Sequence, residues 1–121
     1  MSIQSSTKRK AATVFSCSTA GEIAIGKMLK NSVTAMAFNA QAMTEVEVAV
    51  VENVQDDSGV EQAFAAFEKR FGASMLDLNP KRYVGIILVD GLSGAEEKLI
   101  DKIDDLTDVT FNGGSASASL P

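Results

Sequence analysis

One part of the 121-residue chain limits its fold more than any other part. Residues 83–89 form a continuous apolar run, which is typical of a strand that is covered on both faces. The run breaks at residues 90–94 and is followed by an apolar stripe at helical spacing that ends near Leu106. A short apolar segment follows at residues 109–111. This order predicts a strand, a helix and a strand that are joined by a right-handed crossover.

The preceding segment predicts another helix. Four apolar side chains recur at spacings of four, three and four residues, and so share one helical face: Val60, Phe64, Phe67 and Phe71. Ser58 and Glu61 have the spacing of a capping box, and Gly72 is placed to end the helix. Ser93 and Glu96 have the same capping spacing before the second helix.

Three upstream segments have the pattern of strands. Residues 12–16 predict a short buried strand, and residues 33–39 are apolar and strand-like. Residues 45–54 begin with strict alternation, which predicts a half-buried strand. Because only residues 40–44 separate the last two segments, we expect them to form an antiparallel hairpin. The predicted fold is therefore α/β, with a mixed β-sheet that contains an antiparallel hairpin and a right-handed β-α-β crossover, and with helices packed on the sheet.

The two ends of the chain differ from this body in composition. Residues 1–10 are polar and basic and predict a disordered arm, while residues 117–121 predict a frayed tail. A single domain over residues 11–116 lies between them. The apolar stretch that follows Lys8, Arg9 and Lys10 is too short to favour a signal peptide over a buried strand. We therefore expect a cytoplasmic protein with a reduced Cys17.

Composition excludes several classes of chemistry. The chain has no histidine, so it has no Ser-His-Asp triad, no histidine-ligated zinc and no histidine-ligated haem. Cys17 is the only cysteine, which excludes an internal disulfide and a cysteine-cluster metal site. The net charge of -5 argues against nucleic acid and anionic membranes as partners. No apolar run approaches the ~18 residues that a membrane-spanning helix needs.

Three segments of small residues follow predicted strands. The first contains Ser18, Thr19, Gly21 and Glu22, and its backbone N–H groups and hydroxyls suit an anion or a carboxylate. The alternative interpretation is a tight exit from a strand, in which Gly21 supplies backbone freedom.

The second segment begins with Asp90 and Gly91 at the carboxyl end of a strand, where ligands of open α/β sheets bind. Asp90 suits an amine or a hydroxyl better than an anion, and the alternative interpretation is a capped turn. The third segment, a loop of Gly113, Gly114 and Ser115, is expected to end near Asp90 if the two strands are parallel. We predict a ligand site where the three segments meet at one edge of the sheet.

Three stretches resemble the N-terminal part of FIST domains. They are FSCSTAGEI at residues 15–23, YVGIILVDGLSGAEE at residues 83–97 and LTDVTFNGGSA at residues 106–116. The resemblance runs from about Thr13 to Ala116, most of the chain. It implies a sensory module of signal transduction that binds an amino acid or a related metabolite and is not an enzyme. Some members bind haem, but the lack of histidine removes that role, so no cofactor is expected.

The chain also departs from the family. The family's N-terminal region is longer at both ends, so this chain resembles an internal piece that is truncated at both ends. Because a truncated sheet has exposed edges, we expect that a homodimer covers one of them. We also expect a separately encoded signalling protein as a partner. Two alternatives stay open: a self-associating structural remnant with no ligand, and an enzyme that uses the Cys17 thiol without an acid or base partner.

Overall fold

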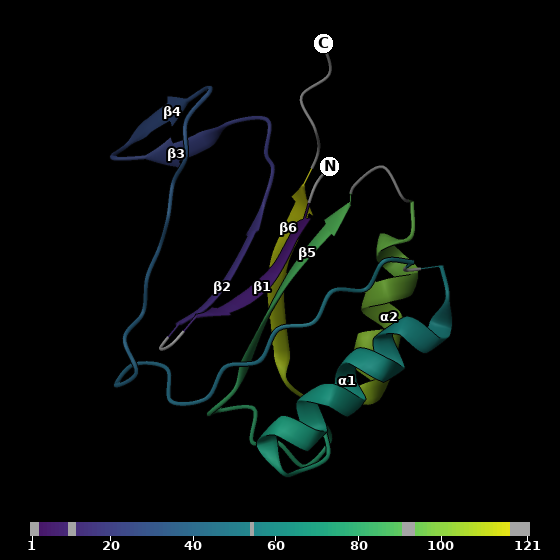
Figure 1. The fold of residues 1–121 in the computed structure, drawn as a ribbon. Coiled ribbons are helices and arrows are strands. Elements are labelled where there is room, and N and C mark those ends of the chain that lie inside the picture. Colours follow the sequence, from purple (N-terminus) through teal and green to yellow (C-terminus); the bar gives the residue numbers. More distant parts are fainter. Residues whose placement is uncertain (1–2, 10–11, 54, 91–93, 117–121) are drawn as a thin grey trace.

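The computed structural model describes residues 3–9, 12–53, 55–90 and 94–116 (Figure 1). In these residues it has two helices and three separate two-stranded sheets. Two of the sheets are antiparallel and the third is parallel. The predicted mixed α/β class is therefore confirmed, and the antiparallel and parallel pairs lie in different sheets.

The parallel sheet belongs to the carboxyl-terminal part of the chain. Strand β5 (Val84–Asp90) leads to helix α2 (Glu96–Leu106), which returns the chain to strand β6 (Thr110–Ala116). The two strands are paired over their full length, with Val84 opposite Thr110 and Asp90 opposite Ala116. The predicted strand–helix–strand unit with parallel strands is therefore present. The prediction that its first strand is covered on both faces is wrong, because Val84 and Ile86 are each 59% exposed and the helices cover only the other face.

Helix α1 (Asp57–Phe71) begins one residue before Ser58, its predicted cap. The Asp56 side chain accepts a hydrogen bond from the Ser58 backbone N–H at 3.0 Å, so Asp56 is the N-cap and the prediction of a Ser58 cap is wrong. Gly72 ends the helix as predicted, with the left-handed φ of 73° that favours glycine. For α2 the N-cap is Ala95, and Ser93, its predicted cap, lies outside the described residues.

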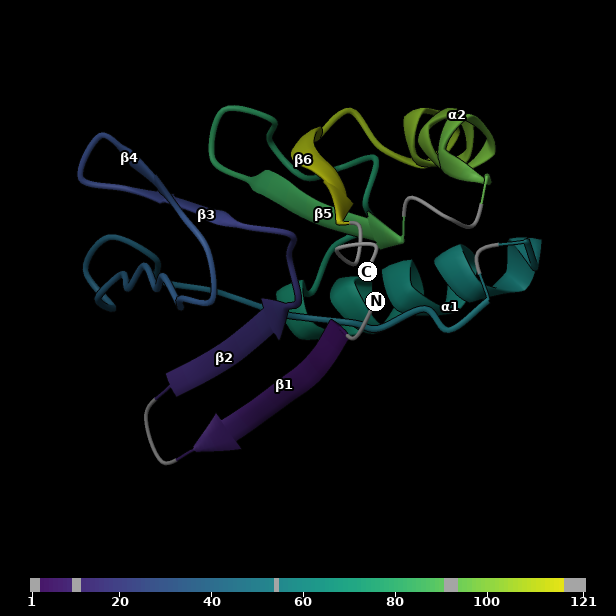
Figure 2. The ribbon, with the colours of Figure 1, turned by 90° about the horizontal axis from the view of Figure 1, so that it is seen from above.

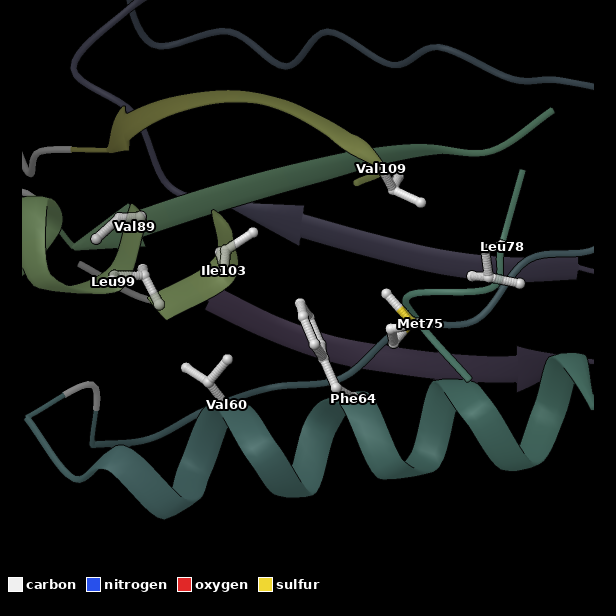
Figure 3. Close-up of a cluster of buried hydrophobic side chains, with 8 residues drawn as sticks. All are labelled: Val60, Phe64, Met75, Leu78, Val89, Leu99, Ile103 and Val109. Atoms are coloured by element: carbon white, nitrogen blue, oxygen red, sulfur yellow. The ribbon is translucent and has the colours of Figure 1, made fainter. Parts of the chain in front are cut away.

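The core lies between the two helices and the β5–β6 sheet. Figure 3 shows Val60 and Phe64 directed from α1 toward the side chains of α2 and β5. The predicted helical face is confirmed for these two buried residues, and its two remaining members, Phe67 and Phe71, pack against the core. The buried cluster consists of Val60, Phe64, Met75, Leu78, Val89, Leu99, Ile103 and Val109.

Aromatic side chains extend this core toward the sheet. The Phe64 ring stacks on the ring of Phe111 from β6, with 5.9 Å between their centroids. Phe111 lies so close to Gly85 of β5 that a Cβ there would come within 2.3 Å of the ring. Position 85 therefore requires glycine, because the Phe111 ring from β6 fills the space that a side chain at position 85 would need.

The amino-terminal part contains two hairpins. Strand β1 (Ile3–Arg9) pairs antiparallel with β2 (Ala12–Cys17), and β3 (Glu22–Ala24) pairs antiparallel with β4 (Lys27–Leu29). The strand predicted at residues 12–16 is present as β2, but the prediction that it is buried is wrong, because Val14 and Phe15 are 53% and 41% exposed. Residues 3–9, predicted to belong to a disordered arm, form β1 instead, because the following strand offers them a hydrogen-bonding partner.

The hairpin predicted from residues 33–39 and 45–54 is wrong. Residues 33–53 contain no strand, although their apolar pattern suits one. Alternation defines an apolar face, whereas a strand also needs a neighbour that pairs with its backbone. The end of this segment runs beside α1 (Figure 2), where Val51 comes close to Gly59.

Candidate functional site

The first predicted segment is held together by the carboxylate of Glu22. This carboxylate accepts hydrogen bonds from the hydroxyls of Ser32 and Thr19 and from the Ser32 backbone N–H, the last at 3.2 Å. The Ser32 hydroxyl contributes most to lowering the pKa of Glu22, followed by the Thr19 hydroxyl. Glu22 therefore joins the β3–β4 hairpin to the chain that follows it, and a ligand amine would compete with these donors.

Gly21 allows a close approach at the base of the same hairpin. A Cβ at Gly21 would lie 2.9 Å from the carbonyl oxygen of Leu29, at the end of β4. Ser18 and Thr19 are exposed beside it. These contacts fit the interpretation of this segment as a tight exit from a strand.

The other predicted residues gather on the β5–β6 sheet. Asp90 is the last residue of β5. The prediction that Gly113, Gly114 and Ser115 form a loop after the last strand is wrong, because β5 pairs with the backbone of β6 as far as Ala116. Pairing nevertheless brings the two segments together: Ser115 lies opposite Val89, one residue before Asp90. Gly91 lies outside the described residues.

The structure therefore divides the predicted site into two groups. Thr19, Gly21 and Glu22 belong to the base of the β3–β4 hairpin, and Asp90 and residues 113–115 belong to the parallel sheet. Figures 1 and 2 show the hairpin to one side of the parallel sheet. The single meeting point of three loops assumed one continuous sheet, whereas within the described residues these hairpin strands pair with each other and with no further strand.

A hollow of about 630 Å³ lies between α2 and the β5–β6 sheet, and we call it the α2 hollow. Its lining includes the apolar side chains of Ile87, Val89 and Phe111, together with Gly113 and Gly114 from the predicted site. Three carboxylates also line it: Glu96, Asp104 and Asp108. The α2 hollow therefore combines an apolar surface with negative charge.

The α2 side of this hollow was missed by the sequence analysis, although the sequence contains a signal for it. Glu96, Ile100 and Asp104 of α2 line the hollow and recur at spacings of four residues. Positions four apart share one face of a helix. No local pattern in the sequence shows that a sheet strand lies beside this face of the helix.

Gly113 is required by the close packing of β6 on β5. A Cβ at Gly113 would lie 1.7 Å from the Ile87 carbonyl oxygen, whereas one at Gly114 would have no atom within 4 Å. Two neighbouring glycines of the α2 hollow thus face different constraints. One allows the strands to approach, and the other borders open space.

Cys17 ends β2 and is half-buried. Within the described parts of the chain, no group of three or more cysteine, aspartate and glutamate side chains is arranged to hold a metal ion. The same residues include no helix that is both long enough and apolar enough to cross a membrane.

The comparison with known families decides the classification. The family model of the FIST N domain matches residues 2–121. The chain belongs to the FIST family. This match extends beyond the stretch from Thr13 to Ala116 in which the sequence motifs were recognised, and FIST domains are sensory and signalling modules. Searches among curated proteins and among solved structures found no match.

Proposed function

We propose that this FIST domain is a non-catalytic sensory module that binds a small molecule in the α2 hollow. The observation that carries the proposal is the hollow itself, whose volume of about 630 Å³ falls within the range of roughly 300–1,000 Å³ for small-molecule pockets. The hollow contains Gly113 and Gly114, two residues that the sequence analysis had assigned to a ligand site.

The lining favours an amino-acid-like ligand or a related metabolite. Its apolar part would contact Ile87, Val89 and Phe111, and its ammonium group would face the carboxylates of the α2 hollow. Asp90 and Ser115, at the nearby ends of the paired strands, are the predicted site residues best placed to extend this site. Glu22 has a structural role in this proposal, because its oxygens already accept hydrogen bonds from Thr19 and Ser32.

Thermal unfolding in the presence of amino acids, their decarboxylated amines and small carboxylates would test this proposal. A ligand present at 100 times its Kd adds about 2.7 kcal/mol to the free energy of unfolding, which raises the Tm of a small domain by several degrees. Ile100→Arg should abolish the shift, because Ile100 lines the hollow and is largely exposed, so a long charged side chain fits there at little cost to folding.

The matched control is Asp101→Arg, which places the same side chain one residue further along α2, at an exposed position outside the hollow. The control should keep the full shift in Tm. An equal shift in both variants would place the ligand elsewhere, and the absence of any shift in the parent protein would favour the second candidate below.

The second candidate function is a self-associating structural protein without a ligand. It is favoured by the many exposed apolar side chains of the amino-terminal part, among them Ile23, Met28 and Val33. For the sensory module, we propose a cytoplasmic location, where a lone thiol such as Cys17 stays reduced, and a separately encoded signalling protein as the output partner.

A further inference from the structure

The β3–β4 hairpin is too small to be stable by itself. Each strand has three residues, and in the part of the chain that the structure describes no third strand pairs with them. A two-stranded hairpin is at best marginally stable in water unless a helix or a further strand packs against it. Both views of the fold show this hairpin away from the helices and from the β5–β6 sheet (Figures 1 and 2). A hairpin of this kind needs a surface to pack on.

Ile25, at the tip of this hairpin, is an unusual choice of residue. Ile25 and Gly26 have φ values of 53° and 70°, the left-handed conformations of the primed turns that join short hairpins. Such turns favour Asn-Gly, and a β-branched residue at positive φ is a steric outlier. The Ile25 side chain is nevertheless 98% exposed. Neither the turn nor contact with water favours isoleucine here, which points to a role for its side chain in contact with another surface.

Further apolar side chains are exposed on the hairpin and on the segment that follows it. We call residues 22–38 the apolar arm, and its exposed side chains are Ile23, Ile25, Met28, Val33, Met36 and Phe38. Two of these are methionines, which adapt readily to irregular surfaces. Met28 is 87% exposed and Val33 is 92% exposed, so these side chains receive almost no cover within one copy of the chain.

The chain exposes more surface to solvent than a compact monomer of its mass would expose. The chain exposes 9180 Å², whereas a compact monomer of 12.7 kDa exposes about 6,200 Å². The excess of roughly 3,000 Å² in each copy is comparable to the total of about 2,000–5,000 Å² that obligate dimer interfaces bury. Covering only part of the excess on each of two copies would therefore supply a stable interface.

The parallel sheet offers a surface that suits the apolar arm. Val84 and Ile86 of β5 are each 59% exposed and alternate with Gly85 and Ile87, on the opposite face from the core residue Val89. They form an exposed apolar face on a strand that is already paired and well ordered by β6. This face can receive an apolar side chain without any rearrangement of the core.

We propose that the apolar arm binds a second copy of this chain, with Ile25 packed on the exposed face of β5 around Val84 and Ile86. Exchange of the arms around a twofold axis uses both surfaces in each copy, as a closed dimer requires. The proposal is independent of ligand binding, because neither the arm nor Val84 and Ile86 belong to the lining of the α2 hollow.

The decisive variant is Ile25→Asn. Asn-Gly is the preferred sequence of the turn, so the hairpin itself should become no less stable while the apolar contact is lost. Sedimentation equilibrium over a range of concentrations should show a dimer for the parent protein. Since a twofold dimer loses the contact of a buried isoleucine twice, the dimer Kd should rise at least about 100-fold.

Ile86→Thr tests the other side of the interface. Threonine keeps the branched shape that suits a strand, and residue 86 does not belong to the buried cluster, so the Kd should rise with little change in far-ultraviolet circular dichroism. The matched control is Leu76→Thr, at an exposed leucine outside the arm and outside β5, which should dissociate like the parent protein.

Three results would overturn the proposal. A parent protein that stays monomeric at every concentration would mean that a different protein, or nothing, covers the arm. An unchanged Kd for Ile25→Asn would remove the arm from the interface. An unchanged Kd for Ile86→Thr would exclude β5 as its docking surface.

Discussion

Two regions of this chain have similar apolar patterns, but the apolar side chains are buried in only one of them. In residues 55–116, helices α1 and α2 and the β5–β6 sheet enclose a core. In residues 12–53, no described side chain is buried, although valine, isoleucine, methionine and phenylalanine are frequent there. The difference teaches that apolar residues form a core only where the elements that cover them are available. Consecutive elements of one strand–helix–strand unit meet this condition, and isolated hairpins do not.

Two pairs of polar side chains join the two regions, in addition to the approach of Val51 to Gly59. The Tyr83 hydroxyl donates a hydrogen bond to Glu45 at 2.9 Å, and Arg70 lies 3.7 Å from Glu47. Exposed pairs of this kind contribute little to stability. We therefore expect residues 55–116 to unfold as a cooperative unit, and the amino-terminal region to open at a lower free energy.

The largest expected effect contrasts one phenylalanine from each region. Phe64→Ala removes a side chain that is 6% exposed and stacks on Phe111 of β6, and should lower the free energy of unfolding by about 3–5 kcal/mol. Phe15→Ala, at an exposed position on β2, should lower it by less than about 1 kcal/mol. Urea denaturation of both variants in dilute solution would test this. Equal losses would show that the amino-terminal region has a core of its own.

A smaller change in the free energy of unfolding is expected from a substitution between the paired strands β5 and β6. Gly113→Ala would force a Cβ against the Ile87 carbonyl oxygen and should cost about 1–3 kcal/mol. Gly114→Ala meets no atom within 4 Å and has no positive φ, so its midpoint of urea denaturation should change little. If both substitutions proved neutral, the close approach of β6 to β5 would not contribute to the stability of the carboxyl-terminal region.

The smallest expected effect is a change in the pKa of Tyr83, the only tyrosine of the chain. Its hydroxyl forms the hydrogen bond with Glu45 that joins the two regions. The hydrogen bond to Glu45 raises the pKa of the Tyr83 phenol above its ordinary value of 10.0. Because the pKa is raised by folding, this contact contributes stability below pH 10.0 and loses it as the pH rises through the folded-state value.

Absorbance titration would follow this phenol without interference, because the chain has no tryptophan. Glu45→Gln should lower the pKa of Tyr83 toward 10.0, whereas Glu52→Gln, on the same segment, should leave it unchanged. The absence of any change in Glu45→Gln would mean that the two regions are not joined at this point in solution.

The accuracy of the sequence-based predictions follows the same division. The helical spacing of Val60 and Phe64 and the apolar run at residues 83–89 correctly identified α1 and β5, because each pattern repeats over several turns or residues. The hairpin predicted from residues 33–54 was wrong, because the apolar pattern of one segment does not identify the strand with which it pairs. Gly113 and Gly114 were correctly singled out but wrongly placed in a loop, since local glycine content does not reveal that β5 continues alongside.

The site followed the fold. Sequence reasoning predicted that Asp90 and residues 113–115 would lie near one another, because the carboxyl ends of parallel strands share one edge. It could not predict that the Glu22 carboxylate would accept hydrogen bonds from Ser32, ten residues further along the chain. Nor could it predict that α2 and β6 would leave a hollow between them.

The sequence by itself determined the helices, the parallel strand–helix–strand unit and the FIST family, because these depend on periodicity and on local motifs. Tertiary structure decided which apolar segments obtained a core and which stayed exposed. It also decided which of the predicted site residues came together. The physical reason is that burial and strand pairing are properties of two surfaces, and a sequence pattern describes only one of them.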